Sequence, residues 1–251
     1  MDLQSNYSVS HGIDEKAREI YSRALSFQYT LPKNALSDLM DLIEQYNETW
    51  TVRHLAIDAA IEIALKYGFY DEALKICQQA QQIDAQCGKV YRLESEAIQL
   101  ERSNRFIDAA KKRLEKDISR GECFGTYQKY GDTLIQLGDF DAATELLNQA
   151  LKMAEQEGLM VFDILRSKAV LLRMKGQTTQ AVNLLLQAID NANRWKISST
   201  PVEINKELSR NLHTCGIKEP GAAKMLNNIC RNEGVEPAVA TFSNWLQELA
   251  I

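Results

Sequence analysis

The segment FGTYQKYGDTLIQLGDFDAATELLNQALKMAEQ, residues 124–156, predicts two helices joined by a tight turn. Tyr127, Gly131 and Leu134 stand at positions i, i+4 and i+7, so they share one face of the first helix. Gly138 supplies the left-handed residue that ends this helix, and Asp139 after it favours the positive start of a second helix. The expected buried stripe of the second helix is Phe140, Ala143, Leu146, Leu147 and Ala150.

The same pattern occurs three more times along the chain. The alanine of the second helix recurs as Ala73, Ala109, Ala143 and Ala181, and the turn residue five positions earlier recurs as Gly68, Asn104, Gly138 and Gly176. Asparagine fits this column because it tolerates the left-handed conformation better than most residues. Intervals of 34 to 38 residues are typical of stacked supersecondary units, which here cover residues 54–86, 90–123, 124–156 and 162–195.

These residues resemble the tetratricopeptide repeat family over roughly residues 54–195. The resemblance is carried by the small residue in the first helix, the glycine turn, the aromatic residue after it and the alanine in the second helix. It implies an all-α fold, a right-handed superhelix of about six helical hairpins whose first helices line a concave groove. The sequence departs from the family at Ile61, where a small residue is expected, at Lys116, where other units have alanine, and at Thr178, where an aromatic residue is expected.

The regions outside the repeats are expected to cap the stack, because terminal units must cover an otherwise exposed apolar face. The predicted regions are a flexible N-terminus at 1–12, a degenerate helical pair at 13–50, four repeats at 51–196 and capping helices at 200–251. After the interruption at Ser198 and Ser199, Thr200 is expected to cap the next helix, with Pro201 at its first position and Glu203 three residues on.

The last helix carries an apolar stripe at helical spacing, formed by Phe242, Trp245, Leu246 and Leu249. One interpretation is a docking helix for a partner or for a second copy of the chain, with Phe242, Trp245 and Leu249 in the contact. The other is that Trp245 seals the end of the stack.

Composition indicates a globular protein, since 45% of the 251 residues are hydrophobic and 25% are charged. The net charge of −5 argues against nucleic-acid binding, which usually requires a basic excess. No run of 18 apolar residues exists, so we expect no membrane contact through a spanning helix. Five scattered cysteines without a CxxC motif, and an N-terminus without a secretory signal, indicate reduced thiols in a cytoplasmic protein.

No residue pattern points to catalysis. His11, His54 and His213 stand far apart and no His/Cys cluster occurs, so we expect no metal site. Neither GxxxxGK[ST] nor GxGxxG is present, and we expect no cofactor. The chain is therefore not expected to be an enzyme.

The groove residues can be chosen by a rule, because one residue turns a helix by about 100° from the buried stripe. The rule selects Asp58, Glu62, Tyr91, Glu94, Ile98, Glu101, Gln128, Asp132, Arg166 and Arg173 as the partner-binding groove. Counted with their neighbours, acids dominate in the first three units and bases in the fourth. We therefore expect a partner that is basic along most of its length, with an acidic end near Arg166 and Arg173. The alternative is that these are ordinary charges of exposed helices.

The leading hypothesis is a non-catalytic adaptor or scaffold that binds a peptide or helix of another protein in this groove. Acidic residues at Asp58, Glu62 and Glu94 argue against a clamp for the C-terminal carboxylate of chaperones, which some relatives form with Lys and Asn. The alternative is a ligand-sensing regulatory domain that controls an effector or transcription. Residues 201–251 have a net charge of −1, which would repel nucleic-acid phosphates.

Overall fold

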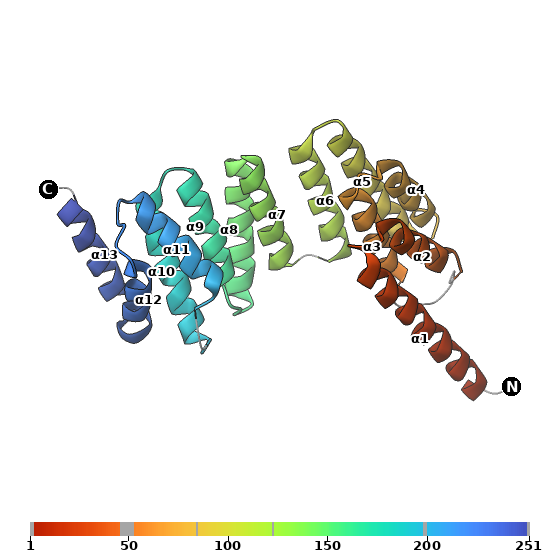
Figure 1. Cartoon of the computed structure of the whole chain (residues 1–251), viewed down its shortest axis with the longest axis horizontal. Helices are drawn as coiled ribbons and strands as arrows, with labels where there is room; N and C mark the ends of the chain where they lie inside the picture. The colour runs from red at the N-terminus through yellow and green to blue at the C-terminus, as the bar shows by residue number, and fades with distance from the viewer. Residues whose placement is uncertain (1–2, 46–52, 84, 122, 198–199, 250–251) are drawn as a thin grey trace. The chain divides into compact units, whose positions relative to one another are not determined.

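A computed structural model describes residues 3–45, 53–83, 85–121, 123–197 and 200–249 of the chain. These residues form thirteen α-helices and no strand (Figure 1). The helices are α1 (Leu3–Phe27), α2 (Pro32–Gln45), α3 (Arg53–Lys66), α4 (Tyr70–Ala80), α5 (Ala85–Arg102), α6 (Phe106–Arg120), α7 (Phe124–Leu137), α8 (Phe140–Gln156), α9 (Phe162–Met174), α10 (Thr178–Arg194), α11 (Val202–Thr214), α12 (Ala222–Glu233) and α13 (Val235–Leu249). They belong to two compact units, Met1–Arg120 (unit 1) and Gly121–Ile251 (unit 2).

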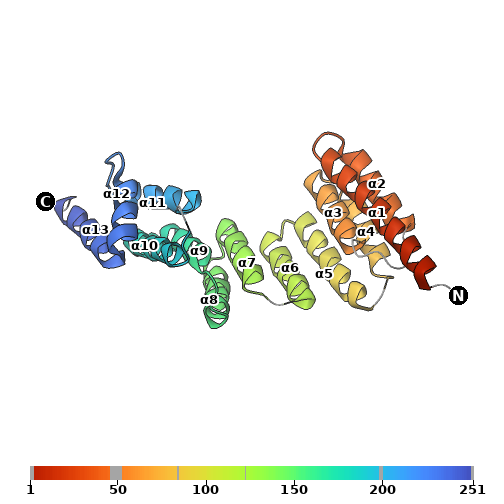
Figure 2. The same cartoon turned by 90° about the horizontal axis from the view of Figure 1, so that it is seen from below.

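Within each unit every helix packs on the helix that follows it in the sequence. Pairs such as α5 and α6 lie side by side in both views of the structure (Figures 1 and 2). In unit 2 the leading helix α9 also contacts the leading helices on either side of it, α7 and α11. The predicted all-α stack of helical hairpins is confirmed.

The turns of the hairpins use the residues that the sequence singled out. Gly68, Gly138 and Gly176 have positive φ angles of 76°, 83° and 79°, and Asn104 adopts the same region at 58°. At Gly138 the N–H donates to the carbonyl of Ile135, and the next N–H donates to the carbonyl of Leu134. These bonds satisfy carbonyls that the end of α7 leaves without a helical partner.

Close approach of α7 and α8 depends on the small residue at Gly131. A Cβ atom placed there would lie 2.8 Å from the side chain of Leu147, which is fully buried. Real Cβ atoms do not come so near, so a larger residue would force the Leu147 side chain or the helices themselves to shift. Ala143 and Ala150 on α8 are likewise fully buried.

Helix starts are only partly as predicted. The Asp139 carboxylate accepts a hydrogen bond of 3.2 Å from the N–H of Ala142 and caps α8. The predicted cap at Thr200 is wrong, because Pro201 precedes α11 and no side chain caps this helix. The Thr200 hydroxyl is instead hydrogen-bonded to Asn227 of α12, at 2.8 Å.

The first helix, α1, begins at Leu3, inside the range for which a flexible terminus was expected. No proline precedes Pro32, and a single glycine in a helix, here Gly12, costs only about 1 kcal/mol. The sequence therefore contains no strong helix breaker in this range. Residues 46–50 of the predicted N-terminal pair, and Ser198 and Ser199, lie outside the described residues.

The last helix, α13, packs on α10 and α12. Phe242 is fully buried there, so it cannot contact a second copy, and the docking role predicted for it is corrected. Trp245 is half-buried and Leu249 is 55% exposed. The apolar stripe of α13 is thus used in large part to close the core of unit 2.

Candidate partner-binding surfaces

The predicted groove residues are divided between the two units, and each unit is described by itself. In unit 1, Tyr91, Glu94 and Ile98 of α5 are at most 2% exposed, so they do not line an open surface. The 100° rule assumed that only one side of the leading helix is covered, but α6 packs along α5 and reaches these positions. Asp58 and Glu101 are partly exposed, and Glu62 of α3 is exposed.

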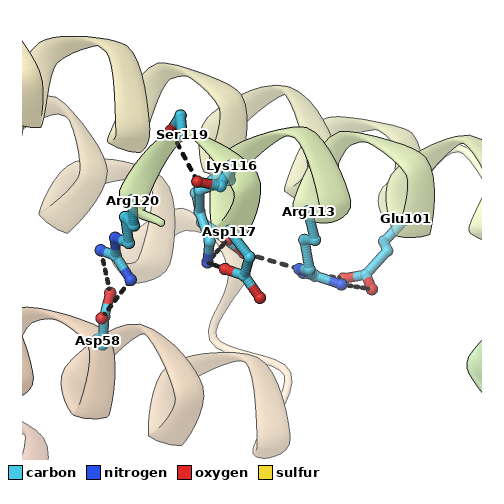
Figure 3. Close-up of polar contacts among 8 residues, drawn as sticks. Asp58, Glu101, Arg113, Lys116, Asp117, Ser119 and Arg120 are labelled. Carbon is cyan, nitrogen blue, oxygen red and sulfur yellow. Dashed lines mark hydrogen bonds and ion pairs between the residues drawn. The ribbon is translucent and has the colours of Figure 1, made fainter. Parts of the chain in front are cut away.

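A buried ionic cluster joins α5 to α6 around Glu94, and Figure 3 labels its members Glu101, Arg113 and Lys116. The Arg113 Nε donates to the Glu94 carboxylate at 2.8 Å, and the Lys116 ammonium binds its other oxygen. Arg113 also donates to both carboxylate oxygens of Glu101. Burial alone would raise the pKa of Glu94, but the positive charges of Lys116 and Arg113 outweigh it and hold that pKa below its usual value.

Lys116 explains one departure from the repeat pattern. It stands where the other units have the buried alanines Ala80, Ala150 and Ala188. Its side chain is 13% exposed and carries the counter-charge of Glu94. A lysine at a position that should be small was therefore the sequence signal for this cluster, although it did not reveal the partner.

A second ion pair joins α3 to the end of α6. Two nitrogens of the Arg120 guanidinium donate to the Asp58 carboxylate at 2.7 and 3.0 Å (Figure 3). The guanidinium carbon also lies 5.4 Å from the centre of the Tyr91 ring. Sequence reasoning missed the bases of α6 because it counted only leading helices. Of the acids selected in unit 1, Glu62 alone forms no ion pair in the described part, so this surface is less acidic than predicted.

In unit 2 the selected residues gather on one surface of α7 and α9, which we name the α7–α9 surface. It consists of Gln128, Asp132, Asp163, Arg166, Val170 and Arg173. The Gln128 amide lies 3.4 Å from the Ser167 hydroxyl and so links the two helices. These side chains are exposed or half-buried, apart from the buried Ser167 beneath them.

On this surface the buried Nε of Arg166 has no hydrogen-bond partner in the described chain. Its nearest acids are Asp132 at 4.0 Å and Asp163 at 3.7 Å, both beyond hydrogen-bond length. Burial raises the pKa of Asp132, and the nearby Ser167 hydroxyl and Arg166 charge do not compensate. Arg166 therefore has no acid within hydrogen-bond length, whereas Asp132 has the Ser167 hydroxyl as a hydrogen-bond partner.

Arg173, by contrast, already forms an ion pair within unit 2. Its Nε donates at 2.5 Å to Glu207 of α11, a carboxylate whose side chain is 3% exposed. Asn211 and Arg210 donate to the same carboxylate at 3.0 and 3.3 Å. The expectation that Arg173 meets an acidic end of a partner is thus corrected, because an acid of the same unit already holds it.

The sequence of this unit agrees with its geometry, since residues 124–157 match the family model of the tetratricopeptide repeat. These residues are a tetratricopeptide repeat. For residues 124–157 the family predicted from the sequence is confirmed, and α7 and α8 are the two helices of the matched repeat. No curated protein sequence matches the chain.

Tetratricopeptide repeats are generally non-catalytic units of protein–protein interaction, and α7 places this repeat directly on the α7–α9 surface. None of the helices in the described ranges is long and apolar enough to span a bilayer. Nor do three or more His, Cys, Asp or Glu side chains gather as metal ligands among the residues that the structure describes.

Proposed function

We propose that the protein is a non-catalytic adaptor or scaffold that binds a peptide or helix of another protein on the α7–α9 surface. The observation that carries the proposal is Arg166, a half-buried arginine whose nearest acids, Asp132 and Asp163, lie at 4.0 and 3.7 Å, beyond hydrogen-bond length. A guanidinium group can form two parallel hydrogen bonds with one carboxylate. Such charge-assisted hydrogen bonds are stronger than hydrogen bonds between neutral groups. A partner acid would therefore find prepositioned donors at Arg166.

The acids beside Arg166 define the rest of the partner segment. Asp132 and Asp163 lie 4.0 and 3.7 Å from nitrogens of the guanidinium, so a purely acidic peptide would be repelled. A segment with basic residues facing Asp132 and Asp163, and one acid facing Arg166, would complement all three groups. This agrees with the basic segment and acidic end expected from the sequence, with Arg166 rather than Arg173 donating to the carboxylate of the acid.

The test compares Arg166→Gln with Arg194→Gln as a matched control. Arg194 lies on the trailing helix α10, is 76% exposed and pairs only with Asp190 in the described structure. Proteins captured from native cells by the wild-type chain would be identified by mass spectrometry, and their binding segments made as peptides for titration. We expect Arg166→Gln to weaken peptide binding by about tenfold or more and Arg194→Gln to leave it unchanged. If the wild type and Arg166→Gln bound the peptides with equal affinity, the assignment of the α7–α9 surface as the binding site would be wrong.

The basic part of the segment is tested separately with Asp132→Asn and Asp163→Asn. If lysines or arginines of the partner face these acids, each variant should weaken binding and reduce its dependence on salt. Unchanged salt dependence would show that the partner is not basic there.

One observation favours the second candidate, a ligand-sensing regulatory domain. Unit 1 contains a pocket between α3, α5 and the end of α6, separate from the α7–α9 surface. If the effector were a transcription unit, the full chain should shift a random DNA duplex in a gel at low salt. We expect no shift, because the net charge of residues 201–251 is negative.

A further inference from the structure

The pocket of unit 1 has the size and the mixed lining of a small-molecule site. Its volume is about 470 Å³, within the range of roughly 300–1,000 Å³ that is usual for such sites. Leu55 and Val90 supply apolar walls, and Asp58, Tyr91 and Arg120 supply polar groups. Leu55 is 52% exposed, so the pocket offers apolar surface to a ligand.

Tyr91, a buried residue beside this pocket, carries an unsatisfied polar group. The residue is 1% exposed, and its hydroxyl has no hydrogen-bond partner in the described chain. Burial raises the pKa of this hydroxyl, and the charged groups that act on it, Asp58 and Arg120, line the same pocket. A buried hydroxyl without a partner destabilises the free chain, so a ligand atom that completes the bond would be favoured.

The two full charges of the pocket balance each other. Two nitrogens of the Arg120 guanidinium donate to the two oxygens of the Asp58 carboxylate at 2.7 and 3.0 Å. A guanidinium has five N–H donors, of which this pair uses two, and the carboxylate keeps free lone pairs. A ligand with one net charge would gain from one group and be repelled by the other. A ligand with adjacent positive and negative groups would match both.

We propose that this pocket binds a free α-amino acid with an apolar side chain. The ammonium group of the zwitterion would donate to Asp58, and its carboxylate would accept from Arg120 and from the Tyr91 hydroxyl. The apolar side chain would lie against Leu55 and Val90 and cover the exposed part of Leu55. This site is in unit 1 and is independent of the proposed partner-binding surface in unit 2.

Titration calorimetry on the full chain tests the requirement for both charges. L-leucine would be compared with 4-methylpentanoate, which lacks the ammonium group, and with 3-methylbutylamine, which lacks the carboxylate. We expect saturable binding of L-leucine or of the larger L-phenylalanine, and at least about tenfold weaker binding of both analogues. The proposal fails if neither amino acid binds, or if an analogue binds as tightly as L-leucine.

The residues are tested with Asp58→Asn combined with Arg120→Gln, which keeps the shape of the pair but removes its charges. The matched control is Asp71→Asn combined with Arg102→Gln, a more exposed pair of unit 1 that lies at 2.9 Å and does not line the pocket. Affinity for L-leucine should fall at least about tenfold in the first double variant and stay unchanged in the second.

Tyr91→Phe provides a test that does not disturb the ion pair. Removing a hydroxyl that has no partner should leave the unfolding temperature of the free chain equal or higher, because its desolvation cost disappears. The same variant should bind L-leucine several-fold more weakly. Unchanged affinity in Tyr91→Phe would overturn the assignment of the hydroxyl to the ligand.

Discussion

At the scale of single residues, the position of Lys116 shows why a repeat can depart from its pattern and remain stable. A lysine at a small-residue position would be destabilising by itself, because its ammonium group would be buried without a partner. Glu94, 2% exposed, provides that partner, and Arg113 binds the same carboxylate. Lys116 on α6 is therefore matched by Glu94 on α5, and the repeat keeps its fold although it departs from the pattern.

Lys116→Ala restores the residue of the other units and is nevertheless expected to destabilise the chain. Buried Glu94 would keep Arg113 but lose its second cation, at a cost of about 1–3 kcal/mol in the free energy of unfolding. Urea unfolding followed by circular dichroism measures this. Lys112→Ala is the control on the same helix, since Lys112 is more exposed and binds Glu96 and Glu115 at the surface. An alanine at 116 that stabilises the chain would contradict the role of Glu94.

Cys123 is expected to be alkylated before Cys77, Cys215 and Cys230. It is exposed at the start of α7, and a hydrogen bond from the Thr126 side chain lowers its pKa. Burial raises the pKa of Cys77 to about 12 and of Cys230 to about 11, so few thiolates form there at pH 7. Iodoacetamide labelling followed by peptide mass spectrometry gives the order. Thr126→Ala should raise the pKa of Cys123 and slow its labelling several-fold at pH 7; faster labelling of Cys77 would refute the order.

At the scale of elements, the sequence predicted the ends of the leading helices, because each end depends on one residue type at one position. Gly68, Asn104, Gly138 and Gly176 ended their helices as expected because few residues adopt a positive φ. The surface residues were less predictable, since Glu94 and its partners are 19 and 22 positions apart and meet only after α5 and α6 pack. The spacing of residues along one helix cannot show which of its side chains the next helix will bury.

Gly138 gives the sharpest test of this difference. Gly138→Ala should lower the free energy of unfolding by about 1–2 kcal/mol, because φ at this position is 83°. A steric clash would not contribute, since no neighbouring atom lies within 4 Å of an added Cβ. Gly138→Asn should cost less, as Asn104 already occupies the equivalent turn. Gly125→Ala, in the first turn of α7 with ordinary φ, should be neutral or stabilising. Urea unfolding of the three variants would measure these costs, and an asparagine no better than alanine would show that φ is not the cause.

At the scale of the whole molecule, each unit has a core of its own, and α13 closes that of unit 2. Residues 121–251 produced alone should therefore fold and unfold cooperatively on heating. In this fragment Phe242→Ala should cost about 3–5 kcal/mol, since the ring is fully buried, and Leu249→Ala much less, since Leu249 is 55% exposed. If α13 instead paired two copies of the chain, Leu249→Ala or Leu249→Asp would change the molar mass measured by light scattering. Phe242→Ala would then leave the stability of the fragment unchanged. Calorimetry and light scattering on the same two variants thus separate the closing of a core from the pairing of two copies.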